Sequence, residues 1–325
     1  MAETAVDEVV EEESSQQHTH GACMTRALQS LEGLAAGDAF GECFFDPDNR
    51  APENRASRVL PPAPWRFTDD TMMAISVCAC LERHRGIEPE WLAESFARHY
   101  EPERGYGHAM NALLMRLSVI GAANWFEEAQ ELFNGEGSFG NGAAMRVAPV
   151  GAYFAHNLNL VAEQAALSAI ATHCHPEGIA GAVAVAVATA IAWRDRDTAR
   201  PMDARVFLEQ VRASTLESAV RDGIDRALKL PAATTALDAA LTIGNGTRVS
   251  AQDTVPFALW SAARSLHNYE DALWETVNGG GDIDTNCAIV GGIVAVRTGS
   301  SAIPGEWLRR REALEPLLHA AMKND

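Results

Sequence analysis

Two acidic clusters, far apart in the chain, most constrain how this sequence can fold. The first is Thr68-Asp69-Asp70-Thr71, and the second, near the other end, is Asp282-Ile283-Asp284-Thr285-Asn286. Adjacent carboxylates repel one another, and gathering them in a fold is costly unless a cation neutralises them. Each cluster precedes an apolar run, so either one alone is equally well explained as a helix cap. Together they favour a fold that unites them around metal.

The residue types in these clusters indicate which metal they would hold. Carboxylates and hydroxyls, with no His or Cys among them, are the all-oxygen ligands that hard divalent ions such as Mg²⁺ require. If folding brings the clusters together, their four carboxylates can hold two ions. An EF-hand is excluded, because its sixth position would be Cys287 rather than Gly and its twelfth would be Ile293 rather than Glu.

Apolar periodicity predicts helices almost throughout the chain. Leu92, Phe96 and Tyr100 recur at four-residue spacing, and the runs 71–81 and 288–296 are apolar on nearly every side. A helix that is apolar on every side is typically buried at the centre of a protein and surrounded by other helices. Strand signals are weak. We therefore expect an all-α fold, a single compact bundle of roughly a dozen helices or more. Both acidic clusters would lie at the N-terminal ends of core helices, on the floor of a shared cleft.

Two further segments carry expectations about the fold. The run from Ile179 to Trp193 is the longest apolar stretch, but its 15 residues are short for a membrane span, which needs about 20. We expect a buried core helix there and no membrane segment. Near the end, Trp307 and the leucines from Leu314 to Leu318 mark one helical face behind Pro304.

Composition and charge limit the partners and the compartment. The net charge of −18 argues against nucleic-acid phosphate as an electrostatically steered partner. Residues 1–20 carry six acidic residues and no Lys or Arg, so we predict a disordered acidic tail over residues 1–22 and one domain over residues 23–325. The six cysteines follow no zinc-ribbon spacing, and the chain begins without a signal peptide. We expect free thiols and a cytoplasmic protein.

Glycine-rich segments suggest where a ligand would bind. The segment Gly137–Arg146 is a glycine-dense loop that runs into a stretch of small residues. Exposed backbone N–H groups and a following helix end suit a phosphate or pyrophosphate, although such a loop can also be an ordinary tight turn. It is neither a Walker loop nor a dinucleotide fingerprint. The segment His173-Cys174-His175 lacks a second metal-binding cluster, which favours a loop contact or a helix end.

The order of these motifs resembles that of the ADP-ribosylglycohydrolase family, over roughly residues 24–298. The motifs are Gly37-Asp38-Ala39-Phe40-Gly41, Thr68-Asp69-Asp70-Thr71, Gly140-Asn141-Gly142-Ala143-Ala144-Met145-Arg146, Thr172-His173 and Gly280-Gly281-Asp282-Ile283-Asp284-Thr285-Asn286. The resemblance implies an orthogonal helical bundle with a binuclear metal cleft. It also implies cleavage of the N- or O-glycosidic bond between ADP-ribose and a modified group, with free ADP-ribose as a product.

The resemblance also implies roles for individual residues. The ligands of two Mg²⁺ or Mn²⁺ ions would be Thr68, Asp69, Asp70, Asp282, Asp284 and Thr285. The pyrophosphate would be cradled by Gly137, Ser138, Phe139, Gly140 and Asn141, with His173 on the phosphate side. Asp69 and Asp70 suit the combination of metal ligation with general-base catalysis, because a carboxylate stabilises the oxocarbenium-like state at the ribose and can accept a proton from water. Which of the two is the base is left open.

One departure from the family pattern bears on the substrate. Where members acting on serine-linked ADP-ribose carry a catalytic glutamate, four residues after Gly41, this chain has Phe45. Glu42 and Asp46 are nearby but out of register, and either a place in the cleft or a place on the surface is open to them. The departure argues against serine-linked substrates and favours arginine-linked or other ADP-ribosylated groups. The alternatives to a hydrolase are an ADP-ribose-binding pseudoenzyme and a crystallin-like structural protein. We expect a monomer.

Overall fold

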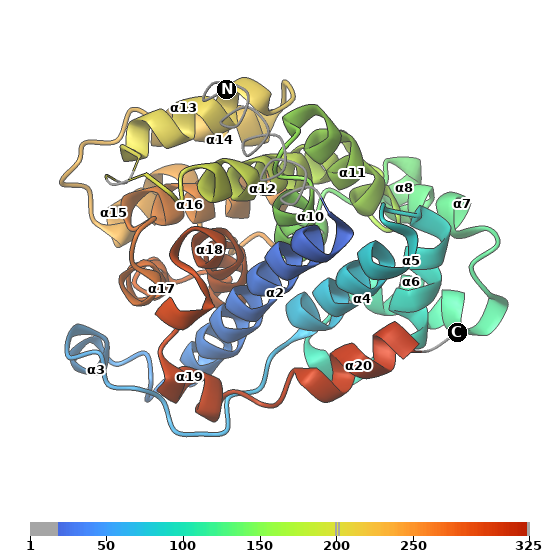
Figure 1. Cartoon of the computed structure of the whole chain (residues 1–325), viewed down its shortest axis with the longest axis horizontal. Coiled ribbons are helices and arrows are strands. Elements are labelled where there is room, and N and C mark those ends of the chain that lie inside the picture. The colour runs from blue at the N-terminus through green and yellow to red at the C-terminus, as the bar shows by residue number, and fades with distance from the viewer. Residues whose placement is uncertain (1–18, 199, 201, 324–325) are drawn as a thin grey trace, which may run out of the picture.

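The computed structural model describes residues 19–198, 200 and 202–323, and it is helical (Figure 1). Over these residues it contains α-helices, three 3₁₀ helices and two isolated β-bridges, but no strand, which confirms the all-α prediction. The α-helices are α2 (His20–Glu42), α3 (Pro52–Ala56), α4 (Asp69–His84), α5 (Pro89–Arg98), α6 (His108–Ile120), α7 (Trp125–Gln130), α8 (Leu132–Gly135), α9 (Gly142–Met145), α10 (Ala148–Tyr153), α11 (Leu158–Ile170), α12 (Pro176–Arg194), α13 (Ala204–Ser214), α14 (Ala219–Ala227), α15 (Ala236–Ile243), α16 (Ala251–Arg264), α17 (Tyr269–Val277), α18 (Ile283–Thr298), α19 (Gly305–Arg310) and α20 (Glu315–Lys323). The 3₁₀ helices are η1 (Cys43–Phe45), η2 (Pro102–Arg104) and η3 (Ser300–Ala302).

The centre of the bundle is the pair α2 and α18, which pack along their lengths, with α4 against α2 (Figure 1). Gly33, Gly37 and Gly41 recur at four-residue spacing and so lie on one face of α2. A Cβ atom at Gly41 would lie 2.7 Å from the Cα atom of Asp284, and one at Gly37 would overlap the carbonyl oxygen of Cys287. Only glycine permits this separation between the two helices. The contact brings the start of α18 against the end of α2.

Both acidic clusters lie at the N-terminal ends of buried helices, as predicted. Thr68 is the N-cap of α4, and Asp69 and Asp70 form its first turn. Asp282 is the N-cap of α18, and Asp284 lies in its first turn. Every residue of α4 from Asp69 to Leu81 is buried, as expected of a central helix.

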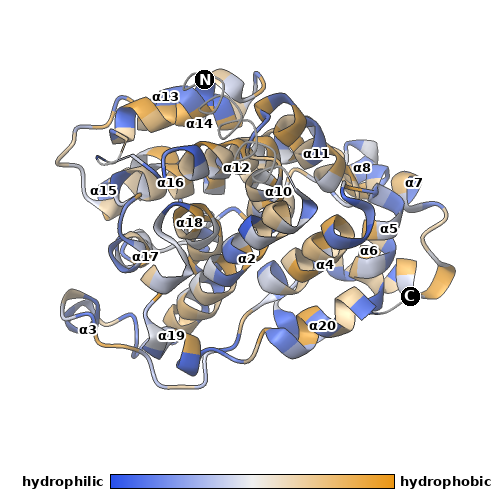
Figure 2. Cartoon of the chain, in the orientation of Figure 1, coloured by the Kyte–Doolittle hydropathy of each residue, from blue (hydrophilic) through white to orange (hydrophobic). Residues whose placement is uncertain are grey.

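The apolar segment 179–193 is the core of α12. This is the one helix among the described residues that is long and apolar enough to cross a membrane, yet 78% of its most apolar window is buried inside the protein. It packs against α10, α11, α16 and α18. Figure 2 shows apolar residues along these inner helices, whereas outer helices such as α13 and α20 carry both hydrophobic and hydrophilic residues. All six cysteines are free thiols, as predicted.

Two boundaries differ from the expectation. Residues 20–22, which we assigned to the acidic tail, form the first turn of α2 behind the N-cap Thr19; residues 1–18 lie outside the described part. The apolar face near the C-terminus belongs to two helices, α19 and α20, rather than one. The chain is extended between them because Trp65 accepts a hydrogen bond from Glu312 N (2.9 Å) and donates one to Arg310 O (2.7 Å).

The contact between α2 and α18 predicts a large effect of one methyl group. In Gly33→Ala the new methyl would overlap the side chain of Ala295 and the carbonyl oxygen of Gly291. We expect this variant to lose about 1–3 kcal/mol of unfolding free energy, as overpacked cores do. The control is Gly21→Ala in the same helix, where nothing lies within 4 Å. It should stay within about 1 kcal/mol of wild type or be more stable. Urea denaturation of both variants measures the difference, and equal stabilities would contradict the close packing.

Candidate metal centre and ligand cleft

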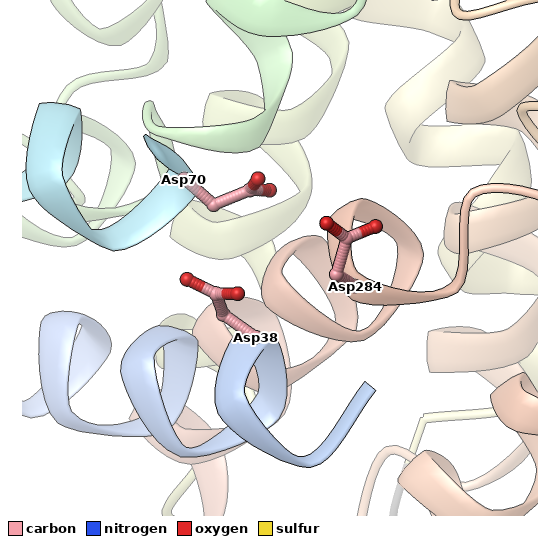
Figure 3. A group of neighbouring side chains, drawn as sticks. All are labelled: Asp38, Asp70 and Asp284. Carbon is pink, nitrogen blue, oxygen red and sulfur yellow. The ribbon is translucent and has the colours of Figure 1, made fainter. Parts of the chain in front are cut away.

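Three carboxylates from three helices converge at the heart of the bundle (Figure 3). They are Asp38 of α2, Asp70 of α4 and Asp284 of α18, and one oxygen of each lies within 4.8 Å of the others. Asp38 and Asp70 are 0% and 1% exposed, so solvent does not screen their charges. The sequence singled out Asp70 and Asp284. Asp38 was predicted only as part of the Gly37–Gly41 motif and was assigned no role. Its place in that motif was the sequence signal for a functional carboxylate.

Asp38 is already saturated by hydrogen bonds from α4. It accepts bonds from the backbone N of Thr68 (2.9 Å) and of Thr71 (3.1 Å), and from their hydroxyls (2.9 and 2.5 Å). A carboxylate at a helix N-terminus satisfies free backbone N–H groups and interacts favourably with the helix dipole. Asp38 therefore fixes the first turn of α4, and its charge adds to the negative potential of the centre.

The unsatisfied oxygens in the cluster belong to the other two residues. Asp70 Oδ1 and Asp284 Oδ1 are buried and have no hydrogen-bond partner among the described residues. A buried polar atom without a partner costs about 1–3 kcal/mol, and more when it is charged. Burial and the neighbouring carboxylates raise the pKa of both residues well above the usual aspartate range. A hard divalent cation fits this set of oxygens, because it would satisfy both atoms and neutralise the repulsion.

The other predicted ligands lie around the same cleft. Thr285 Oγ1 is 3.4 Å from Asp70 Oδ2, and Thr68 Oγ1 is 3.0 Å from the same atom. Asp282 accepts a hydrogen bond from Asn141 Nδ2 (2.6 Å), which links the second acidic cluster to the glycine-rich loop. Burial first and the Asp38 charge second raise the pKa of Asp69 to about 8. The structure thus brings together all six residues, and metal ligation by each of them stays a prediction.

Two cavities meet at these carboxylates. The first, of about 560 Å³, is lined by the glycine-rich loop and by Phe133, Phe139 and His173, and we call it the aromatic cavity. The second, of about 320 Å³, is lined by Glu42, Phe45 and further charged residues, and we call it the charged cavity. Gly105, Asp282 and Asp284 line both. A ligand that fills the aromatic cavity would therefore reach the carboxylates with one end.

The glycine-rich loop packs directly on His173. A Cβ at Gly142 would lie 2.8 Å from His173 Cε1, and one at Gly140 would lie 3.2 Å from His173 Nε2. Gly137 has a φ of +74°, which favours glycine. The helix that follows the loop, α9, has only four residues. A helix this short has little dipole, so the partial charge that we expected from the helix end is small, and any phosphate binding would depend mainly on the loop itself.

His173 is held in place by a hydrogen-bonded chain from Arg146 through Thr172. Arg146, which is buried, donates to Thr172 Oγ1 (2.9 Å), and Thr172 Oγ1 lies 2.7 Å from His173 Nδ1. The threonine hydroxyl can donate its proton to Nδ1, and in that tautomer Nε2 is the N–H that faces the loop. Burial first and the Arg146 charge second lower the pKa of His173 well below its usual range. A neutral imidazole therefore offers a donor to the aromatic cavity. His175, by contrast, caps α12.

The structure distinguishes the two acidic residues that follow Gly41. Glu42, the last residue of α2, is half-buried and lines the charged cavity together with Phe45. Burial first and the Asp38 charge second raise the pKa of Glu42 to about 7. Asp46 is exposed, accepts a hydrogen bond from Asp48 N in a turn (2.9 Å) and lines neither cavity. Glu42 is therefore the carboxylate of this segment that faces the cleft.

Comparison with known proteins agrees with this architecture. The family model described as ADP-ribosylglycohydrolase matches residues 19–324. Human ADP-ribosylhydrolase ARH3 is 26% identical over 343 residues, which cover 89% of this chain and 91% of that protein. The ADP-ribosylarginine hydrolase Tri1 of Pseudomonas putida (strain GB-1) is 25% identical over 304 residues, which cover 88% and 74%. A solved structure, an ADP-ribosylglycohydrolase-related protein complex, superposes with a TM-score of 0.65 at 27% identity, covering 92% of this chain and 96% of that one.

The raised aspartate pKa values predict how stability depends on pH without metal. Between about pH 4, the unfolded aspartate value, and the pKa of Asp69 at about 8, the folded protein binds more protons than the unfolded chain. The unfolding free energy in EDTA should therefore fall as pH rises through this window. Mg²⁺ should reverse or flatten that slope, because it binds the ionised carboxylates. Chemical denaturation across the window, with EDTA and with Mg²⁺, checks this. Identical slopes in both conditions would contradict the metal centre.

Proposed function

The chain belongs to the ADP-ribosylglycohydrolase family, and on that premise we propose that it is a metal-dependent hydrolase that releases ADP-ribose from a modified group. The observation that carries the proposal is the pair of buried, unsatisfied oxygens on Asp70 and Asp284, because Asp284 lines both cavities and Asp70 belongs to the same carboxylate cluster. A structural protein has no use for mutually repelling buried charges, which lower its stability. A catalytic metal site requires them.

The aromatic cavity has the size and chemistry for ADP-ribose. Its volume of about 560 Å³ lies in the range of small-molecule sites. Phe133, which is 47% exposed, and Phe139 have ring centroids 5.5 Å apart and offer faces on which adenine can stack. In the loop from Gly137 to Asn141, Gly137 N donates to Leu132 O (2.9 Å) and Gly140 N to Ser138 Oγ (3.2 Å), so the backbone N–H groups of the other loop residues are the ones we assign to the pyrophosphate. His173 Nε2–H is the side-chain donor for the same anion.

The distal ribose would then lie at the carboxylates, where the bond breaks. Bound divalent ions supply a Lewis acid that orients ribose hydroxyls and lowers the pKa of water. Asp70 and Asp284 would ligate these ions. Asp38 fixes the position of the first turn of α4 through its hydrogen bonds to Thr68 and Thr71. Asp69 lines the aromatic cavity, whereas Asp70 does not. We therefore assign to Asp69 the general base, which takes a proton from the attacking water and stabilises the oxocarbenium-like state with its charge.

Turnover with and without chelator tests this function. We expect release of ADP-ribose from an ADP-ribosylated peptide in Mg²⁺ or Mn²⁺, and loss of that activity in EDTA that returned metal restores. Asp284→Asn should lower kcat by roughly 100-fold or more, because it removes a charged ligand of the divalent ions on which the reaction depends. The matched control is Asp46→Asn, four residues after Glu42 and outside both cavities, which should keep wild-type turnover.

The same experiment separates the enzyme from an ADP-ribose-binding pseudoenzyme. Phe45, at the position of the family's glutamate, is the feature that favours the pseudoenzyme. Tight, metal-dependent binding of ADP-ribose without turnover on arginine-, serine- or nucleobase-linked substrates, or on acetylated ADP-ribose, would establish that alternative. Turnover on any of them would exclude it.

A further inference from the structure

The placement of ADP-ribose proposed above does not use the charged cavity, yet this cavity opens onto Asp282 and Asp284 as well. Its lining includes Glu42, Phe45, Arg66 and Glu103, and it shares Asp282 and Asp284 with the aromatic cavity. If ADP-ribose fills the aromatic cavity with its distal ribose at the carboxylates, the group on the anomeric carbon has this second cavity to enter. About 320 Å³ is enough for one side chain.

We propose that the charged cavity is the leaving-group subsite, that it accepts a guanidinium, and that Glu42 is the residue that recognises it. The proposal deepens the proposed function and rests on it, since it names arginine-linked ADP-ribose as the substrate class. Glu42 supplies a carboxylate on the wall of the cavity, and guanidinium pairs with carboxylates through two parallel hydrogen bonds.

The charges around the cavity leave Glu42 available for such a partner. No ion pair within 4.0 Å involves Glu42 or Glu103 in the described part of the chain. Arg104 is occupied, because it contacts Glu312 and donates to Glu101 (2.9 Å) and to the Phe67 carbonyl (3.0 Å). Arg66 is the opposing cation: it is exposed, and its charge acts on Glu42 only at longer range. With the metal carboxylates neutralised by their ions, Glu42 is a carboxylate of this wall that lacks an ion-pair partner among the described residues and can pair with a further cation.

Phe45 gains a role in this arrangement. Its side chain is 40% exposed and lines the cavity beside Glu42. An aromatic face next to a carboxylate binds a planar guanidinium through stacking and the cation–π interaction. Such stacking does nothing for a small neutral hydroxyl. The residue that replaces the family's glutamate therefore changes which leaving group the subsite prefers.

The reaction balances for a guanidinium that is a cation before and after cleavage. Water adds its hydroxide to the anomeric carbon, and the carbon–nitrogen bond breaks with its electron pair moving to the guanidine nitrogen. The remaining proton of water, accepted first by Asp69, ends on that nitrogen. The leaving group is thus the same cation in the substrate and in the product, so a carboxylate at Glu42 can pair with it in both.

Kinetics on differently linked substrates test the subsite. We expect wild type to prefer peptides ADP-ribosylated on arginine over those modified on serine. Glu42→Gln should lose roughly 10- to 100-fold in kcat/KM on the arginine-linked peptide, mainly through KM, as expected for loss of one charged hydrogen-bond partner. Its Kd for free ADP-ribose should stay that of wild type. Glu90→Gln, at an exposed position of α5, is the matched control and should behave as wild type.

A second variant and a small probe keep the test independent of folding and of turnover. Phe45→Leu keeps the bulk of an exposed side chain and should lose roughly 2- to 5-fold on the arginine-linked peptide only. NMR titration should show that methylguanidine binds the wild-type protein saturated with ADP-ribose and Mg²⁺. Methylurea, its neutral isostere, should not bind the wild-type protein, and methylguanidine should not bind the Glu42→Gln variant.

The outcomes separate the two proposals. A preference for serine-linked substrate, or equal losses of Glu42→Gln on every linkage, would overturn the subsite and leave the hydrolase intact. Glu42-dependent binding of methylguanidine in a protein without turnover would support the subsite and overturn the hydrolase. Weaker binding of free ADP-ribose by Glu42→Gln would place Glu42 on the ADP-ribose side and refute the assignment.

Discussion

The close approach of α2 and α18 is the contact on which the rest of the structure depends. Gly33, Gly37 and Gly41 remove the side chains that would hold the two helices apart. Since Asp38 lies on α2 between Gly37 and Gly41, and Asp284 lies at the start of α18, this packing also sets the distance between their carboxylates. The packing of the core and the geometry of the metal centre therefore depend on the same helix interface. Replacing one of its glycines should alter both.

The centre itself lowers stability unless it is filled. Asp38 is stabilised by four donors from the first turn of α4, but Asp70 and Asp284 each keep a buried oxygen without a partner. The raised pKa values of Asp70 and Asp284 have the same cause as this loss of stability. Burial and the neighbouring carboxylates disfavour the charged form of each residue. A cation converts that cost into binding energy. The two cavities that meet at Asp284 then bring a substrate to this cluster of carboxylates.

The sequence predicted the helical class and the position of both acidic clusters, because these depend on local patterns: an apolar run with no polar face, preceded by Thr and Asp. It did not assign Asp38, whose partners Thr68 and Thr71 lie about thirty positions away and meet it only through the packing of α4 on α2. It left Glu42 and Asp46 open, since the end of α2 decides which of them faces the cleft. The apolar pattern near the C-terminus predicted one helical face where the structure has two helices, α19 and α20. The hydrogen bonds of Trp65 to the segment between them are tertiary contacts that a local pattern does not reveal.

The central claim is that the carboxylates of α4 and α18 hold divalent ions beside the ADP-ribose cavity. Anomalous diffraction from crystals grown with Mn²⁺ and ADP-ribose tests it most directly. We predict two Mn²⁺ peaks in the cleft, with Asp70 Oδ1 and Asp284 Oδ1 at about 2.0–2.2 Å from them, and the distal ribose next to the ions. Clear density for ADP-ribose with no anomalous peak at these two oxygens would contradict the account.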